Sequence, residues 1–228
     1  MPAPATSQVF IFDLDGTLVD TAPDLLATLN TILTGEGRQA IGPQQVRRLV
    51  GHGARALITE AFRMTGAPID PARLEILFNV FLTDYASHIA AASRPFPGVV
   101  ETLGRLKAEG VRMGVLTNKP HELTTALLAA LGLDRWFGAV FGQGVRPYLK
   151  PDPRLFDDIV AALGGRGAGA LMIGDSITDV QTARGAGVPA VLVSYGYTPE
   201  PARSLGADAM VDEFRQIPEA ARRLLGGR

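Results

Sequence analysis

Short apolar runs that end in small or acidic residues recur along this chain and alternate with helical patterns. Two of the helical patterns stop at Gly110 and Gly132, and glycine just past the last apolar position is a common helix terminator. Alternating strands and helices predict an α/β fold, with a Rossmann-like parallel sheet covered by helices on both faces. The runs predicted to be buried strands are Val9–Phe12, Met113–Leu116, Ala139–Phe141, Leu171–Ile173 and Ala190–Val193.

The segment 20–93 interrupts this alternation directly after the first strand. Its apolar residues recur at helical spacing in three stripes, and no convincing strand falls among them. We interpret it as an inserted α-helical cap domain, and residues 1–19 and 94–228 as the catalytic core. The chain returns to the core through Arg94–Gly98, whose two prolines suit a linker. A single larger α/β domain with extra helices is the alternative.

The composition excludes several classes of function. With no cysteine among 228 residues, the chain has no disulfide framework, thiolate metal site or cysteine nucleophile, and it fits a reducing compartment. Its 22 basic and 23 acidic residues leave a net charge of -1 without a long basic cluster, so we expect neither nucleic acid nor membrane as a partner. Asp13 and Asp15 interrupt the first apolar run, which argues against a signal peptide or a membrane span. We expect a cytoplasmic protein, monomeric or homodimeric.

Acidic residues follow two of the predicted strands. Asp13 and Asp15 come after the first strand, and Asp175 and Asp179 come after Leu171–Ile173. A lone Asp-x-Asp is often only a solvated loop, but ligands of open α/β sheets bind just outside the carboxyl ends of the strands. Carboxylates without an interspersed arginine are typical ligands of a hard cation. The sequence therefore predicts a Mg²⁺ site at this edge of the sheet.

Groups that bind phosphoryl oxygens follow other predicted elements. Thr117, Asn118 and Lys119 end the strand Met113–Leu116 with a hydroxyl, an amide and an ammonium, and Lys150 stands just before a predicted helix. Only three of the 22 basic residues are lysines and the other 19 are arginines. Two lysines in these loops suggest that a compact ammonium is required there, since the two cations differ in shape and hydration.

The order and spacing of these motifs resemble the haloacid dehalogenase-like superfamily of phosphohydrolases. The resemblance covers nearly the whole chain, and the helical insertion lies where that family carries a mobile cap of the α-helical type. The four matching motifs are Asp13-Leu14-Asp15-Gly16-Thr17, Thr117, Lys150 and Gly174-Asp175-Ser176-Ile177-Thr178-Asp179.

The resemblance implies the roles of four catalytic residues. Asp13 would attack phosphorus, while Asp15 would protonate the leaving oxygen and then deprotonate the hydrolytic water. Thr117 would hydrogen-bond the transferring phosphoryl group, and Lys150 would neutralise charge on it. The spacing agrees with these roles, because residues i and i+2 of an extended segment point the same way.

The resemblance also implies a metal site and contacts to the substrate. Asp13, the backbone carbonyl of Asp15 and Asp175 would hold Mg²⁺, with Asp179 as a further ligand or as a partner of the ligands. We expect three neighbouring residues of the motifs to contact the substrate: Gly16, Thr17 and Asn118.

The segment Leu49–Arg55 resembles the substrate-facing cap loop of phosphoglycolate phosphatases. We expect His52 and Gly53 to contact the substrate there, and Arg47 or Arg55 could help a helix N-terminus to receive a carboxylate. An ordinary turn between helices with exposed charges is the alternative. The run Tyr195-Gly196-Tyr197 also resembles that subfamily, so 2-phosphoglycolate is the expected substrate of a Mg²⁺-dependent phosphoric monoester hydrolase.

Other functions stay open at this stage. A phosphosugar mutase resembling β-phosphoglucomutase, or a phosphatase for sugar phosphates or pyrophosphate, would use the same motifs. A phospho-accepting signalling receiver shares the acidic cluster but would be about half as long and lack the insertion. A non-catalytic binding protein would need no acid at Asp15 beside a nucleophile at Asp13.

Overall fold

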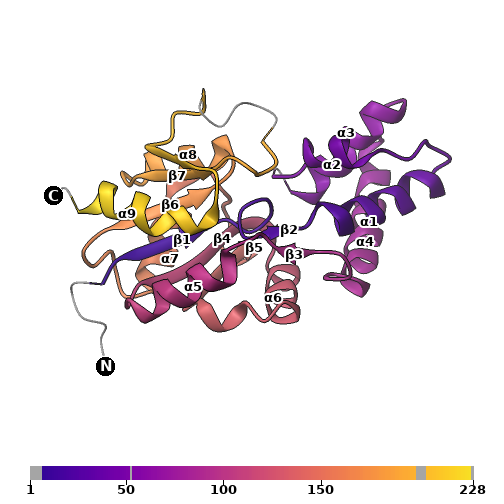
Figure 1. Ribbon diagram of the computed structural model, residues 1–228. Helices are drawn as coiled ribbons and strands as arrows, with labels where there is room; N and C mark the ends of the chain where they lie inside the picture. Colours follow the sequence, from indigo (N-terminus) through magenta and orange to yellow (C-terminus); the bar gives the residue numbers. More distant parts are fainter. Residues whose placement is uncertain (1–6, 52, 199–203, 227–228) are drawn as a thin grey trace.

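A six-stranded parallel sheet forms the centre of the larger domain (Figure 1). The computed structural model describes residues 7–51, 53–198 and 204–226. The sheet order is β5-β4-β1-β6-β7-β8, so the first strand lies at its middle. This confirms the predicted α/β class, and β8 is a strand that the sequence analysis did not predict. The strands are β1 (Val9–Phe12), β4 (Arg112–Pro120), β5 (Ala139–Gln143), β6 (Ala170–Gly174), β7 (Ala190–Val193) and β8 (Ala209–Val211).

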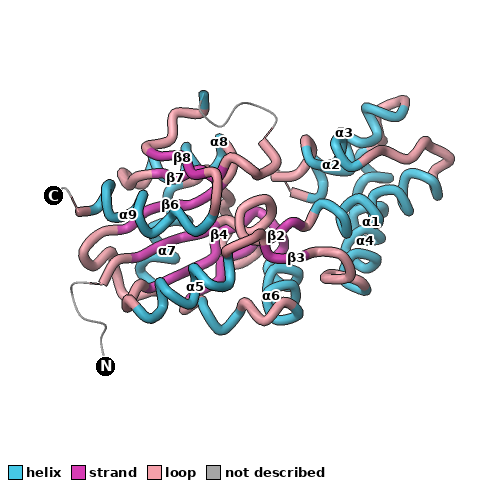
Figure 2. Tube along the Cα trace, viewed as in Figure 1, coloured by secondary structure: helices cyan, strands magenta, loops and turns pink. Residues whose placement is uncertain are grey.

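Helices cover both faces of this sheet (Figure 2). Phe10 and Phe12 of β1 pack on one face and Val9 and Ile11 on the other, as the two-residue period of a strand requires. All four side chains are at most 1% exposed, which is why the strand is apolar throughout. The first face packs against α5 (Val99–Ala108), α6 (His121–Ala130) and α9 (Ile217–Leu225), and the second against α7 (Pro153–Ala162) and α8 (Ile177–Gly185).

The inserted segment forms a separate helical unit with its own apolar core. Leu29, Leu33 and Ile58 are fully or almost fully buried in it, together with Phe81 and Tyr85. Two side chains of the sheet domain, Leu123 and Tyr197, join this cluster. The cap therefore packs directly on the larger domain. Its helices are α1 (Ala22–Gly35), α2 (Pro43–Arg47), α3 (Ala54–Thr65) and α4 (Pro71–Ser87).

Two short strands connect the cap to the core. β2 (Val19–Asp20) pairs antiparallel with β3 (Arg94–Pro95), so the chain leaves and returns at adjacent points. Beside this ribbon the buried Asp24 carboxylate accepts hydrogen bonds from the Ser93 amide at 2.8 Å and the Ser93 hydroxyl at 2.6 Å. The predicted boundary after residue 19 falls inside β2, and the predicted boundary after residue 93 immediately precedes β3. Domains can rotate about short connections of this kind.

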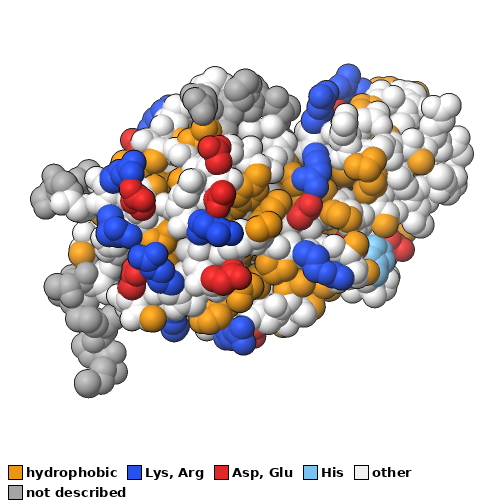
Figure 3. Space-filling view, viewed as in Figure 1, with side chains coloured by type: hydrophobic (Ala, Val, Ile, Leu, Met, Phe, Trp, Pro, Cys, Tyr) orange, Lys and Arg blue, Asp and Glu red, His pale blue; other side chains and the backbone are white. Residues whose placement is uncertain are grey.

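The described surface carries both signs of charge. On the face drawn in Figure 3, Lys and Arg side chains are interspersed with Asp and Glu rather than gathered in one basic patch. No helix in residues 7–51, 53–198 and 204–226 combines the length and apolar character needed to cross a bilayer.

Candidate active site

The carboxyl ends of β1, β4 and β6 meet beneath the cap and bring the predicted catalytic residues together. Asp13 follows β1, and its amide donates to the Ile173 carbonyl of β6 at 2.8 Å. The Lys150 ammonium, delivered by the loop before α7, lies 2.9 Å from Asp13 Oδ1 and 2.6 Å from Asp179 Oδ1. Lys150, Asp13 and Asp179 are all at least 94% buried. These three residues form a desolvated ion cluster at the end of the central strand.

Negative charge exceeds positive charge in this cluster. Burial raises the pKa of Asp13 to about 7, against the attraction of Lys150 and with the repulsion of Asp179. Burial, together with repulsion from Asp13 and Asp179, also raises the pKa of Asp175. Burial opposes the charge on Lys150, but the Asp13 and Asp179 carboxylates outweigh it and raise the pKa of this ammonium. A bound cation would favour the ionised forms of Asp13 and Asp175.

The donor set fits a divalent cation with oxygen ligands. Asp13, Asp175 and Asp179 each offer a carboxylate oxygen, and these oxygens lie within 4.8 Å of one another. Asp179 accepts more hydrogen bonds from the described residues than Asp13 or Asp175 does. Its Oδ1 accepts from Lys150, and its Oδ2 accepts from the Ser176 hydroxyl at 2.7 Å and from two backbone amides. That bonding favours Asp179 as a partner that orients the site, and Asp13 and Asp175 as the carboxylate ligands.

Gly16 and Thr17 pack directly against Asp175. Gly16 has φ +85°, and a Cβ there would lie 2.6 Å from Asp175 Oδ2, so both the turn and the close approach require glycine. The buried Thr17 hydroxyl donates to Asp175 Oδ1 at 3.2 Å. Both residues therefore help to position Asp175, a candidate metal ligand. Their contact with the substrate stays a prediction.

Thr117 and Asn118 lie in the terminal part of β4, which runs on to Pro120, beyond the predicted end. The pairing of β4 with β5 shifts register between Leu116 and Pro120, and this irregular end faces the site. Thr117 Oγ1 accepts from the Lys119 amide at 3.2 Å, so it can still donate its own proton to a phosphoryl oxygen. The Asn118 amide instead exchanges two hydrogen bonds with the Lys150 backbone, at 3.0 and 3.1 Å, and thereby fixes the loop that carries Lys150.

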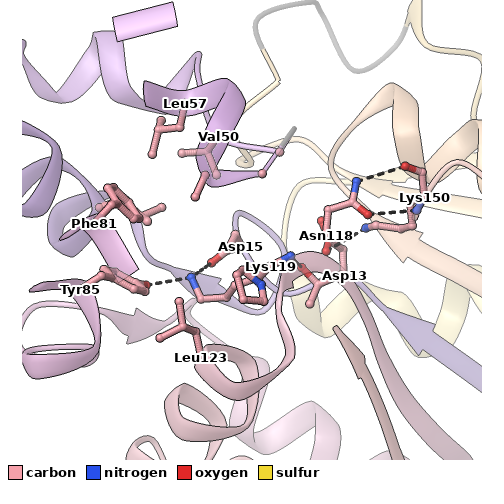
Figure 4. A pocket seen from close by; sticks show the side chains of 16 residues that line it. Asp13, Asp15, Val50, Leu57, Phe81, Tyr85, Asn118, Lys119, Leu123 and Lys150 are labelled. Carbon is pink, nitrogen blue, oxygen red and sulfur yellow. Dashed lines mark hydrogen bonds and ion pairs between the residues drawn. The ribbon is translucent and has the colours of Figure 1, made fainter. Parts of the chain in front are cut away.

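Asp15 points away from this cluster toward the cap. Its Oδ1 lies 3.2 Å from Lys119 Nζ, which is also 2.9 Å from the Tyr85 hydroxyl of α4 (Figure 4). Sequence reasoning placed Lys119 in a phosphate-binding loop without naming it as a site residue, and it counted Tyr85 only as one position of a helical stripe in the inserted segment. The scarcity of lysine in the chain was the signal that singled out Lys119.

A narrow cavity of about 40 Å³ lies between these groups and the cap. The cap side of it is apolar and includes Val50, Leu57 and Phe81 (Figure 4). Gly53 also lines it, and His52 lies outside the described residues. The volume has room for only a few water molecules, so we expect the cap to move when substrate enters.

The two cap arginines expected near the substrate are engaged elsewhere. Arg47 forms an ion pair of 2.6 Å with Asp20 and lies over the Tyr197 ring. Arg55 pairs with Glu75 through two hydrogen bonds of 2.8 Å. Neither guanidinium lines the cavity.

Tyr197, which sequence reasoning connected only with a subfamily, connects the site to the end of β2 and the start of α1. Its amide donates to Asp175 Oδ2 at 2.6 Å. Its hydroxyl donates to Asp20 Oδ1 at 2.6 Å and accepts from the Thr21 and Ala22 amides at 2.7 and 3.0 Å. One buried side chain thus contacts the ribbon that carries the cap while its backbone orients a candidate metal ligand.

Comparisons of this chain with protein families, with known sequences and with solved structures all point to the same family. Residues 8–187 match the family model of haloacid dehalogenase-like hydrolases. The chain is 50% identical to a phosphoglycolate phosphatase of Caulobacter vibrioides, covering 94% of this chain and 90% of that protein, and 41% identical to one of Mesorhizobium japonicum, covering 95% and 96%. The crystal structure of a predicted phosphoglycolate phosphatase from Haemophilus somnus superposes with a TM-score of 0.87 at 30% identity, covering 93% of this chain and 97% of that one. The chain belongs to the haloacid dehalogenase-like hydrolases.

Proposed function

We propose that this enzyme is a Mg²⁺-dependent phosphatase that hydrolyses 2-phosphoglycolate through a phosphorylated Asp13. The observation that carries the proposal is the pairing of two carboxylates after β1. Asp13 is buried against the Lys150 ammonium at 2.9 Å, whereas Asp15 lines the same cavity with its Oδ1 3.2 Å from Lys119 Nζ. This arrangement supports the assignment of Asp13 as the nucleophile and of Asp15 as the acid and base.

The reaction would proceed in two displacements. The Asp13 carboxylate attacks phosphorus, the ester P–O bond breaks, and the leaving oxygen takes a proton from Asp15. Ionised Asp15 then removes a proton from a water molecule, whose oxygen attacks the same phosphorus and releases Asp13 and inorganic phosphate. Asp15 ends the cycle protonated, as it began.

Other residues of the core would neutralise and orient the phosphoryl group. Lys150 offsets charge on Asp13 and on the transferring group, and the Thr117 hydroxyl donates to a phosphoryl oxygen. Phosphoryl transfer depends mostly on such positioning and charge neutralisation. The lysine is held for this role by Asp179 at 2.6 Å and by the two hydrogen bonds between its backbone and Asn118.

Asp13, Asp175 and the backbone carbonyl of Asp15 would hold Mg²⁺, and the clustered carboxylates support this assignment. When bound, the cation supplies positive charge for the phosphoryl oxygens and favours the ionised form of Asp13. Asp179 would orient this site through its bonds to Lys150 and Ser176.

The substrate assignment rests on the relatives and on the lining of the cavity. The two relatives at 50% and 41% identity are named phosphoglycolate phosphatases. The apolar side chains on the cap side of the cavity favour an ester without many hydroxyl groups. We further propose that residues 20–93 act as the substrate-covering cap, with Gly53 on its substrate side, and that the enzyme works in the cytoplasm as a monomer or homodimer.

A substrate panel tests this function. Phosphate release is measured from 2-phosphoglycolate, glucose 6-phosphate, β-glucose 1-phosphate and pyrophosphate, each with Mg²⁺ and with EDTA, and with Asp13→Asn as the inactive control. We expect the highest kcat/KM for 2-phosphoglycolate, abolished by EDTA. Preferential hydrolysis of a sugar phosphate, or phosphate release that EDTA does not affect, would contradict the proposal.

A further inference from the structure

We propose that Lys119 and the Tyr85 hydroxyl bind the carboxylate of the substrate and thereby select a phosphate ester that carries a second anionic group. This inference rests on the proposed function and assigns the specificity of the same site to one residue of the core and one of the cap.

The cavity has few charged groups with which a second anionic group could pair. Its charged lining residues are Asp13, Asp15, Lys119 and Lys150. Lys150 is committed to Asp13 and Asp179, at 2.9 and 2.6 Å. Among the residues that the structure describes, Lys119 is therefore the lining cation left for a second anionic group.

The order of these groups along the cavity matches the order of the groups in a short phosphorylated acid. Figure 4 shows Lys150 and Asp13 on one side, and Asp15, Lys119 and Tyr85 following one another toward the cap. In a short phosphorylated acid the phosphoryl group, the leaving oxygen and the carboxylate follow in that same order. With the phosphoryl group at Asp13 and the leaving oxygen at Asp15, the carboxylate points toward Lys119.

The Lys119 ammonium has a hydrogen-bond donor left for a substrate carboxylate. An ammonium has three donors, and the described partners of this one are Asp15 Oδ1 at 3.2 Å and the Tyr85 hydroxyl at 2.9 Å. Lys119 is only 6% exposed, and its ammonium is buried together with the Asp15 carboxylate with which it pairs. A substrate carboxylate can take the free donor, or replace Asp15 when Asp15 turns to the leaving oxygen.

The walls around Lys119 strengthen this selection. Val50, Leu57, Phe81 and Leu123 line the cavity near the Lys119–Tyr85 pair (Figure 4). An ion pair in apolar surroundings is stronger than one in water. The same walls offer no hydrogen-bond partners to the hydroxyl groups of a sugar, whose burial there would be costly. A compact ester with one carboxylate meets both conditions.

The test compares two esters that differ in the charged group. We measure kcat/KM for 2-phosphoglycolate and for ethyl phosphate, which has a methyl group in place of the carboxylate, in the full-length enzyme with Mg²⁺. Lys119→Met, of similar length but uncharged, should lower the ratio of the two values roughly 10- to 100-fold, since a charged hydrogen bond is lost. Tyr85→Phe should lower it by roughly 3- to 10-fold. Lys107→Met, the same substitution on the exposed face of α5, should leave the ratio unchanged.

Two other results would overturn the inference in distinguishable ways. If Lys119→Met and Tyr85→Phe slow both esters by the same factor, the pair acts only through Asp15, and the proposed function survives without this inference. If the wild-type enzyme prefers ethyl phosphate to 2-phosphoglycolate, the proposed substrate fails along with the inference. Circular dichroism establishes that each variant is folded, and Tyr85→Phe decides the question if Lys119→Met is not.

Discussion

The two ends of the cavity are built differently. At the core end, Asp13, Lys150, Asp175 and Asp179 form a buried network in which almost every polar atom has a partner. At the cap end, the described residues provide one ion pair and one hydroxyl among apolar side chains. A saturated network holds its geometry, whereas an apolar wall with few polar groups can be altered without disturbing it. The comparison suggests that the core end determines the reaction and the cap end determines the substrate.

Removing the proposed nucleophile should have the largest effect, and it tests whether the core end determines the reaction. Asp13→Asn should lower kcat by roughly three orders of magnitude or more, since without the carboxylate no phosphorylated enzyme can form. Its melting temperature should not fall, because the change removes a buried carboxylate whose pKa is raised to about 7 by burial. Steady-state kinetics and calorimetry check both points, and activity close to the wild type would refute the role of Asp13.

Asp15→Asn separates the two proton transfers from the nucleophilic attack. It should lower kcat for 2-phosphoglycolate by roughly 10² to 10⁴, the usual contribution of a positioned acid and base. With p-nitrophenyl phosphate, whose leaving group needs no proton, only the hydrolysis of the intermediate should be slow. A rapid-quench experiment should then show a burst of nitrophenol. If this variant showed equal losses on both substrates and no burst, Asp15 would not be the acid.

The core end should also respond to pH and metal together. Because the pKa of folded Asp13, about 7, exceeds its ordinary value of 3.8, the folded state holds a proton that the unfolded state loses. The metal-free protein should therefore lose stability as pH rises from about 4 to 7, the sign expected when the folded state binds more protons.

Mg²⁺ should offset that loss, since it favours the ionised carboxylates. Melting temperatures in Mg²⁺ and in EDTA at pH 5.5 and pH 8 would measure the effect. We expect the gain from Mg²⁺ to be several degrees larger at pH 8. The same gain at both pH values would mean that Asp13 is not among the ligands.

The smallest expected effect on activity is that of changing Tyr197, which contacts both Asp175 and the start of the cap. Tyr197→Phe keeps the hydrogen bond from the backbone amide to Asp175. It removes the hydroxyl that donates to Asp20 and accepts from the Thr21 and Ala22 amides. Stability should fall by roughly 1–3 kcal/mol, the cost of leaving buried polar groups without a partner. The value of kcat should change less than tenfold. Tyr148→Phe, whose hydroxyl serves the more exposed Asp158, is the matched control and should cost less in denaturant unfolding.

Local patterns predicted most of the framework. β1 and β7 have their predicted bounds, because every residue of both strands is buried and apolar. β8 escaped prediction because it is only three residues long and just one of them, Val211, is buried. β4 runs beyond its predicted end, since its last residues are polar and its register shift depends on pairing with β5.

The site was predictable where its residues share the end of one sheet. Asp13, Asp15 and Asp175 follow strands, so their proximity follows from the fold class. The Lys119–Tyr85 pair joins residues 34 positions apart on two domains, and the tyrosine has the same helical spacing as the apolar residues around it. Such a contact depends on how the cap docks, which no local pattern reports.

The proposed phosphorylation of Asp13 is tested most directly by a search for phosphate on this residue. The wild-type enzyme and Asp15→Asn are mixed with 2-phosphoglycolate and Mg²⁺, quenched in acid within milliseconds, digested and analysed by mass spectrometry. We expect a phosphorylated peptide modified at Asp13, transient in the wild type and longer-lived in the variant. Release of phosphate by the wild type while Asp13 stays unmodified at every time point would contradict it.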